Sequence, residues 1–176
     1  FVKMLPKHLV YAPIYRKGVE IKSKDGKILK ATGKNPFGDS YDRDFSPEDV
    51  AYVLERNPKR FGAVGLFTGS KGKGLVILDV DKNLAIHKKK WGNTLDGAPC
   101  ITSTKKNAAK YVFSVPEELW SSVKGRMLSE QTSTCYEILW NRQGLIFGAY
   151  PGSTTSSEGI YGFEGCLLYT SPSPRD

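Results

Sequence analysis

The sequence predicts one α+β domain that spans residues 1–165 and contains a mostly antiparallel sheet flanked by helices. Short segments of alternating or continuous apolar character recur along the chain, separated by Gly, Pro, Asn and Asp, which is typical of strands joined by turns. Helix-start signals are fewer, and no internal repeat is visible. With 176 residues, of which 39% are hydrophobic and 25% charged, the chain can bury a sizeable core.

The N-terminal part of the chain predicts a strand, a hairpin and a helix. Residues 8–15 alternate well enough for a strand, and the Lys-rich stretch 22–34 carries an Asp-Gly turn that indicates a hairpin and loop. Ser46 is suited to cap a helix, because a proline follows it at the first helical position and Asp49 can close a capping box. Asn57-Pro58 ends that helix.

The remaining elements are mostly strands. A short helix is predicted over residues 83–91, and another begins at Pro116. We expect a glycine-rich turn, 69–74, to separate the strands 63–68 and 75–81. We expect the strands 134–140 and 145–150 to pair as a hairpin across the polar turn 141–144. The predicted strands are residues 63–68, 75–81, 100–104, 109–115, 134–140 and 145–150.

The C-terminal residues 166–176 break in composition from the rest and resemble a translated sequencing adapter, so we expect a non-native tail on a domain fragment. The alternative is a natural Ser/Pro-rich linker. Three cysteines without a CxxC pair favour a reduced, cytoplasmic setting, and no apolar run is long enough to span a membrane.

The net charge of +8 is concentrated in two blocks. Residues 1–34 carry a net charge of +7 and residues 82–110 a net charge of +6, whereas the rest of the chain is slightly acidic. Such blocks indicate a polyanionic partner, most often nucleic acid, although a solvated lysine-rich face is the plain alternative.

Two carboxylates end the most apolar strand. Asp79 and Asp81 are two positions apart, so their side chains project to the same face, about 6–7 Å from each other along a strand. Oxygen ligands in this arrangement suit Mg²⁺ or Mn²⁺. Alternatively, both residues merely end the strand and Asp81 caps the following helix.

Glu137 lies within a predicted strand, where an unpaired charge is costly. If that strand neighbours the strand of Asp79 and Asp81, three carboxylates converge as in a two-metal phosphoryl-transfer site. If it does not, Glu137 faces solvent on a half-exposed sheet. The glycine-rich turn 69–74 does not match the P-loop motif. His87 lies in the predicted Lys-rich helix, and we expect it at the surface.

Taken in order, several motifs resemble the bifunctional primase-polymerase domain of the archaeo-eukaryotic primase superfamily. The resemblance covers roughly residues 30–163 and implies an RRM-like sheet with helices at its sides. The motifs are Gly33-Lys34-Asn35-Pro36, residues 64–69, residues 74–81, Ile101-Thr102-Ser103, residues 111–113, Glu137-Ile138, residues 149–153 and residues 159–161.

The resemblance implies that Asp79, Asp81 and Glu137 bind two divalent ions, Mg²⁺ or Mn²⁺, for template-directed transfer of an NTP or dNTP to a 3′-hydroxyl. It also implies a single-stranded DNA template and primer, a helicase domain further along the chain, and a role in viral or plasmid replication in the host cytoplasm. Lys110 stands where the family usually carries a His. The implied nucleotide-binding residues are Thr68, Gly69, Ser103, Thr104, Lys110 and Ser153.

Two other readings stay open. One alternative to the primase-polymerase is a catalytically degenerate primase-like module that only binds nucleic acid. The other is an unrelated enzyme with a DxD motif, such as a glycosyltransferase or phosphatase. The absence of the usual His favours the binding module, and the presence of all three carboxylates favours the enzyme.

Overall fold

The computed structural model describes residues 2–23, 25–103, 106–124, 126–129, 135–150 and 159–164. The predicted tail, 166–176, lies outside these ranges. The described helices are α1 (Pro47–Arg56) and α2 (Leu84–Trp91), with the short 3₁₀ helices η1 (Val2–Met4), η2 (Gly38–Tyr41), η3 (Gly92–Leu95) and η4 (Glu117–Ser122). The strands are β1 (Tyr11–Tyr15), β2 (Glu20–Lys22), β3 (Ile28–Lys30), β4 (Phe61–Phe67), β5 (Leu75–Val80), β6 (Cys100–Ser103), β7 (Ala109–Ser114), β8 (Arg126–Ser129), β9 (Cys135–Leu139), β10 (Gln143–Tyr150) and β11 (Gly159–Glu164).

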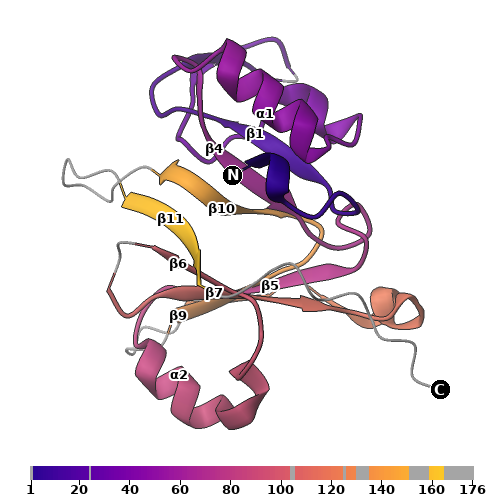
Figure 1. The fold of residues 1–176 in the computed structure, drawn as a ribbon, viewed down its shortest axis with the longest axis vertical. Coiled ribbons are helices and arrows are strands. Elements are labelled where there is room, and N and C mark those ends of the chain that lie inside the picture. The colour runs from indigo at the N-terminus through magenta and orange to yellow at the C-terminus, as the bar shows by residue number, and fades with distance from the viewer. Residues whose placement is uncertain are drawn as a thin grey trace.

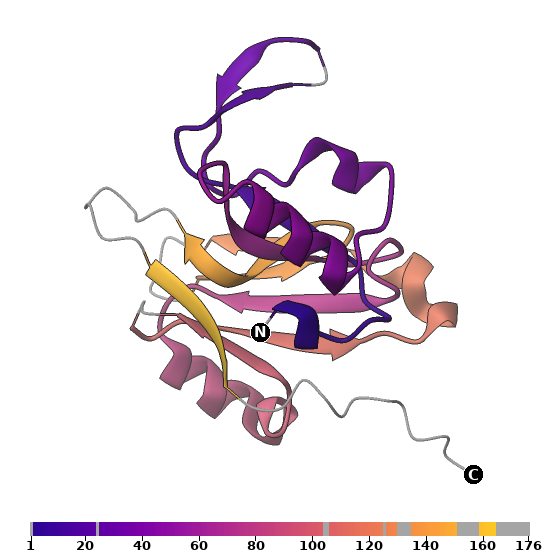
Figure 2. The same ribbon diagram turned by 45° about the horizontal axis from the view of Figure 1, so that its top comes forward.

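Nine strands form one sheet in the order β1-β4-β10-β11-β6-β7-β5-β9-β8, and the described pairings within it are antiparallel. The predicted α+β class with an antiparallel sheet is therefore confirmed. Strands β2 and β3 form a separate hairpin that projects from the body of the molecule (Figure 2), as the Asp-Gly turn predicts.

The large sheet consists of two groups of strands with different orientations (Figure 1). We call β1, β4 and β10 the β4 half-sheet, and β7, β5 and β9 the β5 half-sheet. Helix α1 lies beside the β4 half-sheet and α2 beside the β5 half-sheet, while β11 and β6 join the two groups along one side. The main core contains residues from both half-sheets, including Val64, Leu66, Ile77, Leu139 and Ile146.

The chain passes between the half-sheets at two connections, β4 to β5 and β9 to β10. The predicted hairpin of the last two strands is therefore wrong: β9 pairs with β5 and β8, whereas β10 pairs with β4 and β11. The apolar faces of these strands pack against different neighbours across the core, and this packing outweighs the local turn signal at 141–144. The glycine-rich turn also connects strands that are not neighbours, although Gly69 and Leu75 form an isolated bridge.

Helix α1 begins as predicted. The Asp49 N–H donates to the Ser46 hydroxyl over 3.1 Å, and the Ser46 N–H donates to the Asp49 carboxylate over 2.9 Å, which completes a capping box. The backbone N–H of Asn57 donates to Val53 at the other end. Val50 is fully buried, so the helix covers one side of the main core.

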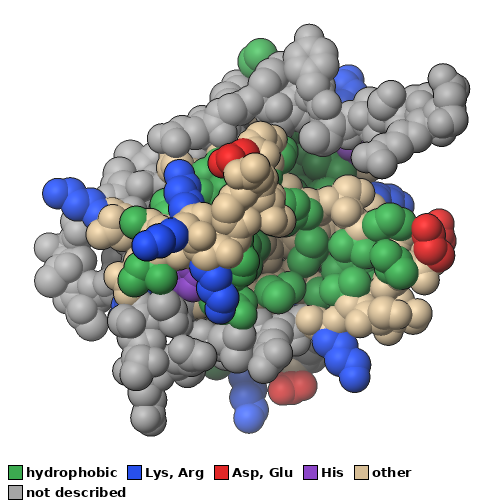
Figure 3. All heavy atoms as spheres, turned by 90° about the horizontal axis from the view of Figure 1, so that it is seen from below, with side chains coloured by type: hydrophobic (Ala, Val, Ile, Leu, Met, Phe, Trp, Pro, Cys, Tyr) green, Lys and Arg blue, Asp and Glu red, His purple; other side chains and the backbone are tan. Residues whose placement is uncertain are grey.

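Helix α2 and η3 pack against the outer face of the β5 half-sheet, opposite the main core. Leu78, Trp91 and Leu95 belong to a second apolar cluster there. Figure 3 shows this side of the molecule, where hydrophobic side chains gather in the middle with Lys and Arg side chains around them. His87 is only 2% exposed and stacks on Trp91, so its expected place at the surface is wrong.

The helix predicted from Pro116 is present as the 3₁₀ helix η4 rather than as an α-helix. In the described part of the chain, we find no helix with both the length and the apolar character needed to cross a membrane.

Candidate functional site

A row of charged side chains crosses the β5 half-sheet next to the main core. Ile77 of β5 is fully buried in that core, and because side chains alternate along a strand, Asp79 projects to the same face. The register places Lys110 of β7 directly opposite Asp79 on one side and Glu137 of β9 directly opposite it on the other. We call Lys110, Asp79 and Glu137 the polar row.

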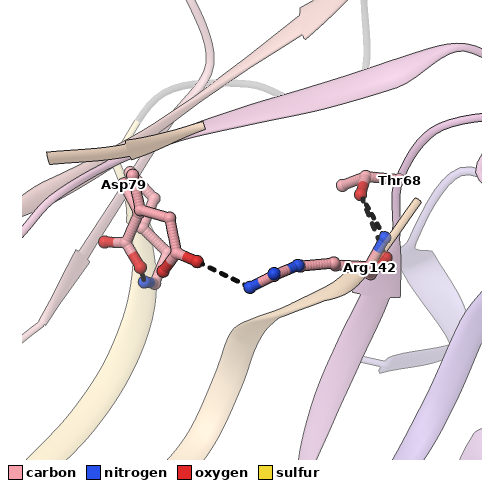
Figure 4. Close-up of polar contacts among 5 residues, drawn as sticks. Thr68, Asp79 and Arg142 are labelled. Atoms are coloured by element: carbon pink, nitrogen blue, oxygen red, sulfur yellow. Dashed lines mark hydrogen bonds and ion pairs between the residues drawn. The ribbon is translucent and has the colours of Figure 1, made fainter. Parts of the chain in front are cut away.

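Each carboxylate of the polar row has a cationic partner. The Lys110 ammonium donates to Asp79, and both side chains are mostly buried, at 8% and 16% exposure. The Arg142 guanidinium donates from Nη1 to Glu137 Oε1 over 2.9 Å, where the side chains are 61% and 22% exposed. Figure 4 shows Arg142 reaching toward this group from the bend before β10, where its backbone lies beside Thr68.

The order of charges explains how two carboxylates are accommodated side by side. Directly opposite residues on antiparallel strands have Cβ atoms about 4.5–5.5 Å apart, so Asp79 and Glu137 would repel each other if nothing compensated them. Lys110 and Arg142 supply one positive charge to each carboxylate. The four side chains together are formally neutral at neutral pH.

Arg142 reaches Glu137 because its backbone is fixed at the crossing between the half-sheets. The Thr68 hydroxyl donates to the Arg142 carbonyl over 3.0 Å and accepts from the Arg142 N–H over 3.1 Å. Thr68 is fully buried, and its own N–H also donates to the Arg142 carbonyl. Thr68, which the resemblance assigns to nucleotide binding, therefore positions Arg142 in this structure.

Gly69 is also explained by this crossing. Its φ of +71° is in the left-handed region, and a Cβ atom at this position would lie 2.0 Å from Asn141 Oδ1. The glycine thus allows the two connections between the half-sheets to approach closely. Lys71 and Lys73 of the same turn both contact Asp44, with nitrogen–oxygen distances of 3.0 and 3.6 Å.

The structure describes the other predicted site residues only in part. Asp81 follows the last residue of β5 and is half-buried, and it does not cap α2, whose N-cap is Asn83. Ser103 ends β6 opposite Tyr161 of β11, but its side chain is outside the described part. Thr104 and Ser153 also lie outside the described residues.

The donor chemistry of the row fits a divalent ion such as Mg²⁺ or Mn²⁺, since carboxylate oxygens are the ligands these ions prefer. Asp79 and Glu137 supply such oxygens from adjacent strands. Over the described ranges, however, no group of three or more His, Cys, Asp or Glu side chains is arranged to hold a metal ion. The fit therefore rests on two carboxylates, which are paired with Lys110 and Arg142 here.

Sequence reasoning missed Arg142. The residue follows a predicted strand in a polar turn and has no motif around it. Its position becomes meaningful only through the crossing at Thr68, 74 positions earlier in the chain.

Comparison with known protein families gives no matching family model, and comparison with curated proteins gives no significant match. The functional argument for this chain therefore rests on the geometry of its residues.

Proposed function

We propose that the chain is a metal-dependent nucleotidyltransferase of the primase-polymerase kind. The observation that carries this proposal is the register of β7, β5 and β9, which aligns Lys110, Asp79 and Glu137. Two carboxylates from neighbouring strands beside a lysine are suited to bind a divalent ion and a phosphate group together. The motif order of the sequence supports the same class.

In this proposal, Asp79 and Glu137 hold the divalent ions, and Asp81 adds a third carboxylate from the end of β5. The ions would supply Lewis-acid activation of the attacking hydroxyl and charge neutralisation of the phosphates. With divalent ions on the carboxylates, the Lys110 ammonium and the Arg142 guanidinium would exchange their contacts with Asp79 and Glu137 for contacts with phosphate oxygens. Lys110 thereby takes the position of the family's usual His.

The substrates follow from the same class. An NTP or dNTP would be the donor, a primer 3′-hydroxyl the acceptor, and single-stranded DNA the template. The basic blocks 1–34 and 82–110 supply positive charge for the DNA backbone. A helicase domain further along the complete protein belongs to this proposal as well.

One observation favours a second candidate, a nucleic-acid-binding module without catalytic activity. Lys110 and Arg142 already neutralise Asp79 and Glu137, so the polar row needs no metal ion to be stable. A degenerate site would keep such ion pairs in place of metals. The two candidates differ in whether the carboxylates exchange these partners for Mg²⁺ or Mn²⁺.

Primer extension on a labelled primer–template with Mg²⁺ or Mn²⁺ tests the proposal. We expect nucleotide incorporation by the wild-type chain and its loss in Asp79→Asn and in Glu137→Gln, with circular dichroism verifying that both variants fold. Glu118→Gln, at an exposed position in η4, is the matched control and should retain activity. Wild-type protein that binds single-stranded DNA without incorporating nucleotides would establish the second candidate, and full activity in both site variants would refute the metal site.

A further inference from the structure

A cavity of about 400 Å³ lies at the crossing between the half-sheets, and Arg142, one of its lining residues, contacts the polar row. This volume is within the range of about 300–1,000 Å³ that is typical of ligand sites. Its walls include Tyr41 of η2, Phe67 and Thr68 at the end of β4, Lys71 of the glycine-rich turn, and Arg142 with Gln143 at the start of β10. We call it the Tyr41 cavity.

The charged residues that line the Tyr41 cavity are basic. Lys71 and Arg142 line it, and none of the described residues that line it is acidic. Lys71 is held in place, since its ammonium lies 5.1 Å from the centre of the Phe67 ring, donates to the Arg43 carbonyl over 3.3 Å and pairs with Asp44. Because Lys73 shares that single carboxylate, the three residues keep one net positive charge.

The cavity also offers an aromatic surface. Tyr41 is 50% exposed, and its ring meets Phe67 edge-on, with centroids 6.1 Å apart and planes at 70°. An exposed aromatic ring flanked by cations is the combination that binds single-stranded nucleic acid, because bases stack on the ring and phosphates contact the cations. A free metabolite anion would need the cations but not the ring.

Arg142 connects the Tyr41 cavity to the polar row. Arg142 lines the cavity, its guanidinium donates to Glu137, and its backbone is fixed by Thr68, which lines the cavity too. A ligand that contacts Arg142 in the cavity would therefore be connected through this one side chain to Glu137, a carboxylate of the proposed transfer site.

We infer that the Tyr41 cavity binds a segment of single-stranded nucleic acid, with one base stacked on Tyr41 and the neighbouring phosphates at Lys71 and Arg142. This inference rests on the proposed function and deepens it, because it assigns the place where the strand enters the site. The two basic blocks then contribute charge for the nucleic-acid backbone, whereas the cavity provides the contact with a base.

Fluorescence anisotropy with a labelled oligodeoxynucleotide of about 12 nucleotides, in buffer with EDTA and without nucleotides, tests the inference. Tyr41→Ala should weaken binding by about 5- to 100-fold, as the loss of one base–aromatic stack predicts, and Tyr41→Phe should keep the wild-type affinity. Tyr52→Ala is the matched control, because Tyr52 is 60% exposed on α1 and does not line the cavity. Equal affinities of Tyr41→Ala and wild type, or equal losses in both alanine variants, would overturn the inference.

Salt dependence and competition provide independent readouts. Lys71→Ala should lower the slope of log affinity against log salt by about 0.7, the value for one phosphate contact with a single strand, whereas exposed Lys59→Ala should not change it. An unchanged slope in Lys71→Ala would contradict the phosphate contact. Excess dATP should leave the oligonucleotide bound, and its displacement by dATP would assign the cavity to a free nucleotide and overturn the inference.

The outcomes separate this inference from the proposed function. Binding that depends on Tyr41 in a protein that incorporates no nucleotide supports the cavity and refutes the polymerase. Incorporation that depends on Asp79 together with binding that is independent of Tyr41 supports the polymerase and refutes the cavity.

Discussion

The two ends of the polar row hold their carboxylates in different ways. Lys110 and Asp79 come from adjacent strands, and both side chains are mostly buried, so solvent screens their charges little. Arg142 reaches Glu137 from outside the β5 half-sheet, and 61% of its side chain is exposed. The difference indicates that breaking the ion pair at the buried end costs more stability than breaking the pair at the exposed end.

The largest expected effect is at the buried end. Lys110→Met keeps the side-chain volume but leaves the Asp79 carboxylate without its ammonium partner, which should lower the free energy of unfolding by about 3–5 kcal/mol. Urea denaturation measures this loss. The double variant Lys110→Met/Asp79→Asn should recover most of it, because the unpaired charge is then absent. A loss below about 1 kcal/mol would mean that this pair behaves like a surface pair.

A smaller loss is expected where the exposed end is attached to the fold. Thr68→Val removes the hydroxyl that donates to the Arg142 carbonyl and accepts from the Arg142 N–H. Loss of these bonds at a buried position should lower the free energy of unfolding by about 1–2 kcal/mol in the same urea measurement. Thr94→Val, at an exposed position in η3, should leave stability within about 0.5 kcal/mol of wild type. Equal effects at both positions would show that the hydroxyl does not fix Arg142.

The exposed ion pair itself should contribute least among the three substitutions. Arg142→Ala should change the free energy of unfolding by less than about 1 kcal/mol, since solvent and salt screen its charge. Urea denaturation at low and high salt measures the change, and the difference from wild type should shrink at high salt. A loss as large as that of Lys110→Met would remove the contrast between the two ends.

A pH effect on the other face of the same strands sharpens this comparison, and we expect it to be the smallest. Burial, followed by the charge of Lys90, lowers the pKa of His87 below its ordinary value of 6.5. Neither ring nitrogen of His87 has a hydrogen-bond partner among the described residues, and its ring contacts Trp91 and Tyr136.

Because folding disfavours the protonated form of His87, the unfolded chain takes up the proton first as the pH falls below about 6.5. The contribution of neutral His87 to the free energy of unfolding is therefore fully present above this pH. It decreases as the pH falls below about 6.5 and through the lowered pKa of the folded state. Thermal unfolding at about pH 7.5 and about pH 5.5 should show this decrease, and His87→Phe should reduce it. An identical pH dependence in His87→Phe would assign the effect to other groups.

Much of the local structure could be predicted from the sequence, because local signals specify it. The capping box at Ser46 and Asp49 fixes where α1 begins, and the Asp-Gly turn marks the β2–β3 hairpin. The pairing of strands could not be predicted in the same way. Nothing within residues 134–150 indicates that β9 joins β5 while β10 joins β4, since this choice depends on core contacts between distant segments.

The candidate site likewise contains features that the local sequence predicts and features that depend on contacts between distant segments. The sequence predicts that Asp79 and Glu137 come together if their strands are neighbours, and this condition is met. Lys110 was expected at the nucleotide site by resemblance, and its ion pair with Asp79 depends on the β5–β7 register. Arg142 and the burial of His87 were missed, because both depend on packing between elements rather than on local composition.

The crossing at Thr68 and Arg142 also has a consequence for the order of folding. These two residues lie 74 positions apart, and β4 obtains its β10 neighbour only from residues 143–150. A ribosome that has released only the first half of the domain would expose one edge of β4 as an unpaired strand. We therefore expect closure of the β4 half-sheet to be a late step, because many residues must be ordered before this distant pairing can form.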